Sequence, residues 1–197
     1  MPRAGRPRTF GLQEAAASAR ELFWQQGYSA TSLRDLAKVV GVRTGSLYAA
    51  FGDKHDLFLR TLNEYAREAG EVSDDLDLDE PVLPQLRGFL ASALAAACSH
   101  PGRGCMLGNT AAELLPGDAA AAAVVRQGFT ALEQALEVAI RHGQTTGEIR
   151  PDLAGRVQAR MLVALVQGLH VVARAQKNPN SLMDIVDGAV EALRPLG

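Results

Sequence analysis

Two adjacent hydroxyl side chains, Thr31 and Ser32, precede a segment of helical periodicity and could bind a phosphate. Asp35 stands three residues after Ser32, which is the spacing of a capping box at a helix N-terminus. The backbone amides and a hydroxyl at such an end form a binding site for an anion. Helix capping alone would also explain both hydroxyls, and we expect them to serve both purposes.

Patterns typical of catalytic and metal sites are weak in this chain. Cys98 and Cys105 flank a Pro-Gly break, so they could be a redox pair or buried, inert thiols. Two cysteines cannot supply a four-ligand zinc site, and His100, His142 and His170 lack metal-ligand spacing. No glycine-rich phosphate loop, nucleophile elbow or paired carboxylate stands out. We therefore expect no enzyme activity, no cofactor and no metal.

The composition is that of a folded helical protein. The 197 residues are 47% hydrophobic and 21% charged, and alanine and leucine outnumber valine, isoleucine and threonine more than twofold. The longest uncharged stretches, 88–102 and 161–173, are shorter than the ~18 residues that span a membrane. No apolar run follows the basic N-terminus, as a secretory signal would require. We expect a cytoplasmic protein with no membrane partner.

The charge is unevenly distributed along the chain. Residues 1–60 contain nine lysines and arginines against five acidic residues, whereas residues 61–197 contain eleven against seventeen. The net charge of −2 therefore combines a basic N-terminal third with an acidic remainder. This split indicates that only one end of the molecule binds a polyanion.

Four short helices are predicted in the first 70 residues: 13–26, 33–40, 44–51 and one that starts after Asp53. The second and third are joined by a three-residue turn that contains Gly41. Two short helices with such a turn are typical of a helix-turn-helix, although other small helical proteins contain similar corners.

The remaining sequence predicts an acidic linker and a larger helical domain. Residues 71–80 contain six acidic residues and precede Pro81. Apolar periodicity then predicts helices at 82–99, 106–115, 119–142 (closed by Gly143), 153–176 and 181–193 (capped by Ser181 with Asp184). With no hairpin pattern anywhere, the predicted fold class is all-α.

The stretch TSLRDLAKVVGVRTGSLYAAFGDKHDLF, residues 31–58, resembles the DNA-binding domain of the TetR family of transcriptional repressors. The matching features are Thr31-Ser32, Leu36-Ala37, Gly41-Val42, Gly45-Ser46-Leu47-Tyr48, Phe51, and Lys54 with Leu57. The resemblance is specific over residues 10–60. Beyond residue 61 it rests on length and helix count, with a weak match at Gly104-Cys105-Met106-Leu107 and Asn109-Thr110.

The resemblance implies an all-helical homodimer with a division of labour along each chain. Residues 1–52 would form the three-helix DNA-binding domain, which would begin with a flexible basic arm at 1–9. Residues 53–80 would be a connecting helix and the acidic linker, and 81–197 the ligand-binding and dimerisation domain.

Position in the helix-turn-helix assigns the DNA contacts. Thr44, Gly45, Ser46 and Tyr48 would face the major groove from the third helix, and Lys54 would contact a phosphate. Together with the two hydroxyls and two arginines discussed next, the expected DNA-binding residues are Arg6, Thr31, Ser32, Arg43, Thr44, Gly45, Ser46, Tyr48 and Lys54.

Arg43 departs from the family pattern, which has a serine or threonine at the start of the third helix. An arginine side chain cannot accept a hydrogen bond from backbone amides. Either Thr44 becomes the cap and shortens the helix, or Arg43 is retained to contact DNA at a cost in helix stability. In the arm, Gly5-Arg6-Pro7-Arg8 is similar to minor-groove AT-hook peptides, although a tail that only adds charge is equally compatible.

The helix at 153–176 is apolar on two faces, so one face needs a partner outside its own domain. Pairing with the last helix across a two-fold axis would give a four-helix interface. The expected interface residues are Met161, Leu165, Gly168, Val172, Ile185, Val186 and Ala189. A monomer with one large core is the alternative.

The other helices of this domain could enclose a ligand pocket with apolar walls. The expected pocket residues are Phe89, Met106, Asn109, Thr110, Glu113 and Phe129. Plain core packing would explain each of them as well, and the resemblance alone favours a pocket.

These features together predict a dimeric repressor that binds a palindromic double-stranded DNA operator and is released from it by a small, apolar effector. A ligand-independent architectural DNA-binding dimer is the alternative, and a helical enzyme has less support.

Overall fold

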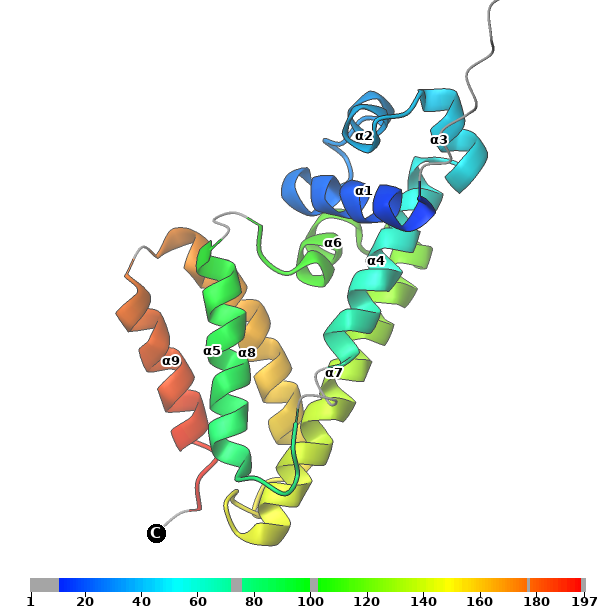
Figure 1. Cartoon of the computed structure of the whole chain (residues 1–197). Helices are drawn as coiled ribbons and strands as arrows, with labels where there is room; N and C mark the ends of the chain where they lie inside the picture. The colour runs from blue at the N-terminus through cyan, green and yellow to red at the C-terminus, as the bar shows by residue number, and fades with distance from the viewer. Residues whose placement is uncertain (1–10, 72–75, 100–102, 177, 196–197) are drawn as a thin grey trace, which may run out of the picture. The chain divides into compact units, whose positions relative to one another are not determined.

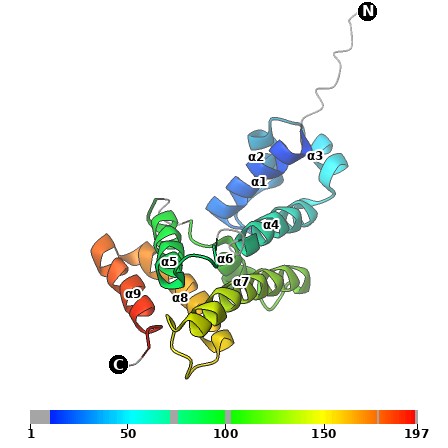
Figure 2. The same ribbon diagram turned by 60° about the horizontal axis from the view of Figure 1, so that its bottom comes forward.

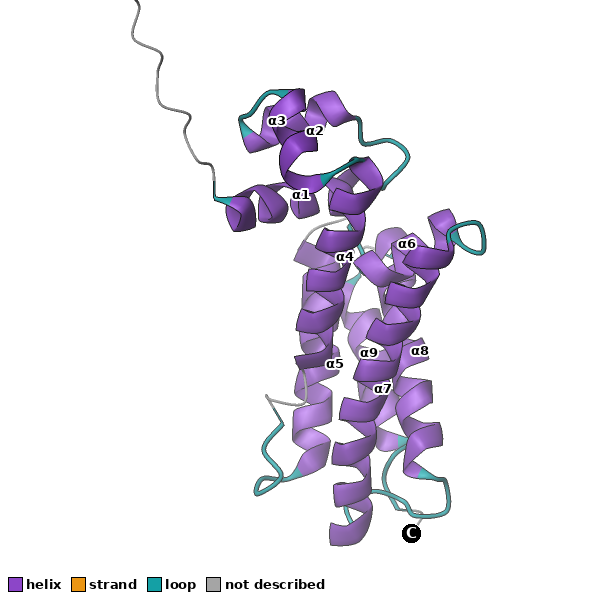
Figure 3. Cartoon of the chain, turned by 90° about the vertical axis from the view of Figure 1, so that its right-hand side faces the viewer, coloured by secondary structure: helices purple, strands orange, loops and turns teal. Residues whose placement is uncertain are grey.

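The computed structural model describes residues 11–71, 76–99, 103–176 and 178–195. These residues form helices and loops without any strand, which confirms the all-α fold class (Figures 1 and 3). The helices are α1 (Leu12–Gln26), α2 (Leu33–Val40), α3 (Thr44–Phe51), α4 (Lys54–Gly70), α5 (Val82–Ser99), α6 (Met106–Leu114), α7 (Ala119–Thr146), α8 (Gly155–Ala175) and α9 (Pro179–Glu191).

The chain forms two compact units that meet within α4, at residues 62 and 63. The first unit contains α1, α2, α3 and the first half of α4. Its core is made of alanine, leucine and phenylalanine side chains with almost no exposed surface, among them Ala19, Phe23, Leu36, Leu47 and Phe58. We expected the DNA-binding domain to end at residue 52, but the start of α4 packs with this unit.

The second unit extends from residue 63 and has one large apolar core. Helices α5, α8 and α9 lie side by side (Figures 1 and 2), and α7 packs along α8 and α6. Helix α5 is long and apolar enough to meet the length and composition criterion for a membrane span. Its apolar side chains, such as Leu86 and Leu90, are buried in this core, which accounts for its composition.

Two helix ends in the second unit differ from those predicted. Helix α7 continues past Gly143 to Thr146, because Gly147 and not Gly143 has the left-handed φ of +81° that ends it. Gly143 is buried inside the helix, where an added Cβ would lie 2.7 Å from Cδ1 of Ile149. Helix α9 begins at Pro179 with Asn178 as its cap, so the predicted Ser181 capping box is wrong.

The N-terminus of α5 is capped by a residue that is remote in sequence. The carboxylate of Glu148 accepts hydrogen bonds from the amides of Val82, at 2.9 Å, and Leu83, at 3.3 Å. This charge-assisted cap joins the α7–α8 loop to the start of α5. It had no local signal, since Glu148 follows these amides by more than sixty positions.

Candidate functional site

The turn between α2 and α3 is closed by backbone hydrogen bonds. Gly41 has a φ of +77°, in the left-handed region that glycine adopts without steric cost. Its amide donates to the Lys38 carbonyl over 3.2 Å, and the Val42 amide donates to the Ala37 carbonyl over 3.0 Å. This pair of bonds is a Schellman motif. The helix-turn-helix predicted around Gly41 is therefore present.

Ser32 and Asp35 form the predicted capping box at the start of α2. The Asp35 amide donates to the Ser32 hydroxyl over 3.2 Å, and the Ser32 amide donates to the Asp35 carboxylate over 3.2 Å. The Ser32 hydroxyl also donates to that carboxylate, which holds the pKa of Asp35 below its ordinary value. Ser32 is exposed, so the capped helix end is open to an anion.

Thr31 lies inside the protein, which corrects the expected phosphate contact of its hydroxyl. Only 1% of the residue is exposed, and its Oγ1 donates a 2.6 Å hydrogen bond to the carbonyl of Gly27. The hydroxyl therefore ties the α1–α2 connection together. Arg6 and the rest of the basic arm fall outside the described residues.

Arg43 is the N-cap residue of α3, and its side chain makes no capping hydrogen bond. The helix begins at Thr44, so the alternative in which Thr44 becomes the cap is wrong. The Arg43 carbonyl accepts from the amides of Ser46 and Leu47, which leaves the exposed side chain outside the helix. An uncapped helix end with a free arginine is consistent with retention of Arg43 for contact with a polyanion.

One face of α3 is exposed and the other is buried. Leu47 and Phe51 pack into the core of the first unit with 2% and 8% exposure, while Gly45, Ser46 and Tyr48 are exposed. A Cβ built on Gly45 would have no atom within 4 Å among the described residues. The fold of this chain therefore does not require a glycine at position 45.

Lys54, at the start of α4, is held against an aromatic ring. Its Nζ lies 4.2 Å from the centroid of the Tyr28 ring, a cation–π contact. The Tyr28 ring packs in turn on Phe58 at a centroid distance of 4.8 Å and on His55 at 6.0 Å. This stacking orders a side chain that would otherwise be freely solvated.

Both units match models of known protein families. Residues 16–61 match bacterial regulatory proteins of the tetR family, and residues 82–188 match the tetracyclin repressor-like C-terminal domain. The chain belongs to the TetR family. The family resemblance drawn from residues 31–58 is thus confirmed, and it extends to the second unit.

Relatives of this TetR-family chain are named transcriptional repressors. The repressor ComR of Escherichia coli strain K12 is 31% identical over 92% of this chain and 88% of its own length. The repressor BdcR of the same strain is 41% identical over 52% of this chain and 53% of its own. A cysteine-substituted CifR, solved with double-stranded operator DNA, has 26% identity and a TM-score of 0.79, with 96% of this chain and 100% of that chain covered.

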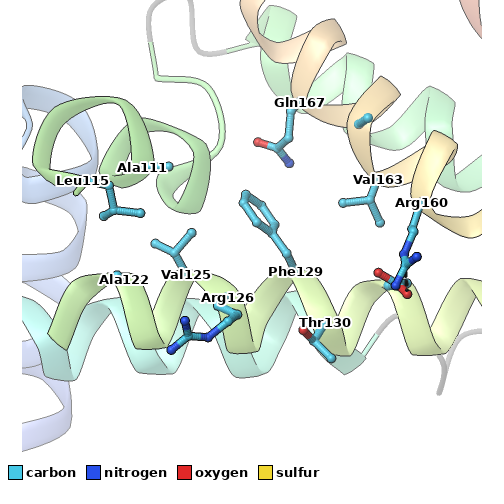
Figure 4. Close-up of a pocket in the computed structure, with 12 residues that line it drawn as sticks. Ala111, Leu115, Ala122, Val125, Arg126, Phe129, Thr130, Arg160, Val163 and Gln167 are labelled. Carbon is cyan, nitrogen blue, oxygen red and sulfur yellow. Dashed lines mark hydrogen bonds and ion pairs between the residues drawn. The ribbon is translucent and has the colours of Figure 1, made fainter. Parts of the chain in front are cut away.

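The second unit of this TetR-family chain contains a groove of about 560 Å³ between α6, α7 and α8. Val125 and Phe129 point into it from α7, and Val163 and Gln167 face them from α8 (Figure 4). Ala111 and Leu115 form the end nearest α6, and Arg160 borders the opposite end. Glu133, which also lines the groove, pairs with Arg160. The walls are mainly apolar, and the charged groups lie at the edges.

Of the predicted pocket residues, Phe129 lines this groove. Met106 and Thr110 lie on the buried face of α6, Phe89 packs against the core of the unit, and Glu113 is exposed. The remaining predicted residue, Asn109, forms polar links to other parts of the chain. Asn109 donates to the Arg103 carbonyl over 2.6 Å and accepts from the guanidinium of Arg174.

The predicted interface residues divide between surface and core. Met161 is 57% exposed, Val172 is 38% exposed and Gly168 is exposed, so these three lie on an open apolar face of α8. Leu165, Ile185 and Ala189 are partly buried against the core of the same chain. Val186 is fully buried there, which corrects its placement at an interface. Val157 and Val171, 45% and 65% exposed, extend the open face.

The second half of α4 is packed tightly against α7 and α6. A Cβ built on Gly128 of α7 would lie 3.1 Å from Cβ of Ala66, and one on Gly70 would lie 3.0 Å from Cβ of Ala131. The Tyr65 hydroxyl donates to Sγ of buried Cys105 over 3.7 Å, and burial raises the pKa of this tyrosine. Helix α7 therefore has α4 on one side and the groove on another.

Proposed function

We propose that this TetR-family regulator represses transcription as a homodimer, with α3 of each chain in the major groove of a palindromic operator. The exposed face of α3 is the observation that carries this proposal. Gly45, Ser46 and Tyr48 make a surface that the fold of the chain does not use, and Gly45 leaves room for a close approach of DNA. Operator binding is also named for relatives such as CifR.

The contacts of this proposal divide into positioning and base recognition. Ser32 with the α2 N-terminus, Arg43 and Lys54 would bind phosphates and set the orientation of the unit. Ser46 could donate to a base edge, and Tyr48 could contact a phosphate or a thymine methyl group. Thr31 contributes by holding the α1–α2 connection.

The exposed apolar face of α8 supports the homodimer. Val157, Met161, Gly168, Val171 and Val172 lie along about four turns of one helix, with no cover from the described part of their own chain. A contiguous apolar face of this kind marks an interaction surface. The same face on a second copy could cover it about a two-fold axis.

The groove supports release by a small molecule. Phe129 lies next to Gly128, which is in contact with Ala66 of α4, and α4 continues into the helix-turn-helix unit. A ligand that separates α7 from α6 and α8 would move α4, and α4 would move Lys54 and the elements that pack on it. A typical coupling of about 1–3 kcal/mol would change operator affinity ~5–150-fold.

The groove can be filled to test this proposal. An operator is selected from random duplexes, and its affinity is measured with and without saturating Nile red, a neutral apolar dye. We expect Nile red to weaken operator binding by roughly 5–150-fold. Ala111→Phe, on the groove wall, should abolish this effect and spare operator binding. Ala112→Phe, exposed on the same helix, is the matched control and should retain it.

An operator affinity that Nile red leaves unchanged, in a protein that still binds DNA, would support the ligand-independent architectural dimer. Failure to select any duplex sequence would contradict the repressor itself.

A further inference from the structure

At the end of the groove formed by Arg160, two arginine side chains share one carboxylate. Nε of Arg156 lies 2.9 Å and Nε of Arg160 lies 3.0 Å from the same oxygen, Oε1 of Glu133. Both hydrogen bonds lower the pKa of Glu133, so this group stays ionised near neutral pH. These three side chains therefore have a net charge of +1. The nearby carboxylate of Glu137, which also acts on Arg156, is paired with Arg141 and does not change this sum.

The geometry of this cluster leaves hydrogen-bond donors unused. Each arginine donates its Nε–H to Glu133, so the forked, two-bond pairing of a guanidinium with a carboxylate is not formed. The terminal nitrogens of both side chains remain available to a second anion. Of the two arginines, Arg160 lines the groove and Arg156 does not.

Two further polar groups at the groove lack partners among the described residues. Gln167 points into the groove from α8 (Figure 4), and its amide makes no hydrogen bond within the described parts of the chain. Gly108 leaves room for this side chain, because a Cβ there would lie 2.4 Å from Oε1 of Gln167. Arg126, at the rim, makes no ion pair within those parts, and it adds a second unneutralised positive charge.

We propose that the groove binds a monocarboxylate with an apolar body, whose carboxylate lies beside Arg160 and whose body lies over Phe129. The proposal deepens the effector role given to this groove above and depends on it. The ligand needs an apolar body because the walls are formed by Val125, Phe129, Val163 and the alanines of α6 and α7. It needs one negative charge because the groove and its edges carry positive charge in excess.

Cationic and neutral ligands fit this groove less well than a carboxylate. An apolar cation would approach Arg160 and Arg126 with like charge, and like charges without a counterion oppose binding. A neutral apolar molecule would bury apolar surface but would give the terminal nitrogens of Arg160 no negatively charged acceptor. A charge-assisted hydrogen bond to a carboxylate is therefore the interaction that distinguishes this ligand.

Three probes of equal chain length test the proposal by titration calorimetry on the full-length protein. They are octanoate, 1-octanol and octylammonium. We expect octanoate to bind at least about tenfold more tightly than 1-octanol, and octylammonium to bind most weakly. Equal affinity of octanoate and 1-octanol would overturn the carboxylate proposal and leave an apolar effector groove in place.

Substitutions in the cluster locate the carboxylate. Arg160→Gln should weaken octanoate about tenfold and leave 1-octanol unchanged, while Arg156→Gln should change octanoate less than about threefold. Glu133→Gln should strengthen octanoate severalfold, because it removes the competing anion. The side chains of Arg156 and Arg160 on α8 are largely exposed, whereas that of Glu133 on α7 is mostly buried. Melting temperatures of the free variants therefore verify the fold.

The controls separate this inference from the repressor function. Equal losses in Arg156→Gln and Arg160→Gln would overturn the position beside Arg160 and indicate a nonspecific charge effect. Absence of binding by all three probes would overturn the carboxylate ligand as well. Operator affinity, measured on the same samples without probe, decides the DNA-binding proposal independently of either result.

Discussion

The first and second units place their functional residues by different means. In the first unit, Ser32 is positioned by Asp35 three residues away, and the α2–α3 turn is set by Gly41 and its immediate neighbours. In the second unit, Gln167 of α8 lies against Gly108 of α6, and the start of α5 is capped by Glu148. The proposed DNA-binding surface can thus be built from local rules, while the proposed ligand groove needs contacts between distant segments.

The two units also differ in what their exposed surfaces, the side of α3 and the open face of α8, require. The side of α3 that we propose faces DNA is exposed in the single chain and needs only a rigid backbone behind it. The open face of α8 is apolar, and in the proposed homodimer a second copy covers it. The groove beside it shares Ala164 with the exposed side of that helix. Changes in the second unit should therefore affect assembly first and DNA binding through it.

The largest effect should come from a charge on the open face of α8. Met161→Glu would place an unpaired carboxylate in the proposed interface, at a cost of several kcal/mol. We expect folded monomers and operator affinity lowered about 100-fold or more, because two half-sites about 34–36 Å apart need linked recognition helices. Light scattering and fluorescence anisotropy measure the two effects.

Val138→Glu is the matched control for this change. Val138 is 56% exposed on α7, almost the same as Met161, but lies on another helix. It should remain dimeric and bind the operator normally. A dimeric Met161→Glu protein, or a monomeric unmodified protein at micromolar concentration, would contradict the proposed interface. Val186→Glu should instead unfold the protein, because Val186 is fully buried in its own chain.

The second prediction concerns the close contact of α4, α6 and α7. Gly128→Ala would place a methyl group 2.7 Å from Cδ1 of Leu107 and 3.1 Å from Cβ of Ala66. We expect the free energy of unfolding to fall by about 1–2 kcal/mol, since overpacking exceeds the gain in helix propensity. Gly88→Ala, whose added Cβ would have no atom of another described element within 4 Å, should instead raise it by about 0.5–1 kcal/mol. Urea unfolding measures both changes. If the two substitutions change the free energy of unfolding in the same direction, the tight contact at Gly128 is disproved.

Most of the first unit could be predicted from the sequence because its rules are local. The Ser32–Asp35 capping box and the bounds of α2 and α3 follow from capping, turn and periodicity patterns within a few residues. The burial of Thr31 could not be predicted, because both hydroxyls fit a capping role and only the fold shows which one points outward. The sequence likewise left two alternatives at the start of α3, a cap at Thr44 or a retained Arg43, and only the fold shows that Arg43 is the N-cap residue.

The second unit was predicted at the level of its helices but not of its groove. Gly143 has the sequence appearance of a helix end, yet it is a glycine so that Ile149 can pack against α7. Val186 and Met161 are both apolar residues at helical spacing, and periodicity cannot tell a core-facing from a partner-facing position. The groove residues of α6, α7 and α8 are far apart in sequence, so Phe129 was found among them and Arg160 was missed.

The third prediction sharpens the argument that α3 is shaped for its partner. Gly45→Ala should leave the free energy of unfolding unchanged or higher, because no atom of the described protein lies within 4 Å of the new methyl group. The same methyl would meet the DNA backbone and should weaken operator binding about tenfold. Gly88→Ala again serves as control, with no loss of operator affinity. Unchanged DNA binding by Gly45→Ala would mean that α3 does not approach DNA closely at this end.

The smallest expected effect lies in Lys54, where the two units share a helix. Loss of one phosphate contact in Lys54→Ala should weaken specific and random duplexes alike and reduce the magnitude of the salt slope, log K against log salt, by about 1. Tyr28→Leu removes the ring that holds the ammonium 4.2 Å from its centroid but keeps the charge. It should weaken binding less than Lys54→Ala and keep the slope, because a disordered lysine still releases a counterion. An unchanged slope in Lys54→Ala would remove this residue from the contact surface and leave the start of α4 as a structural cap alone.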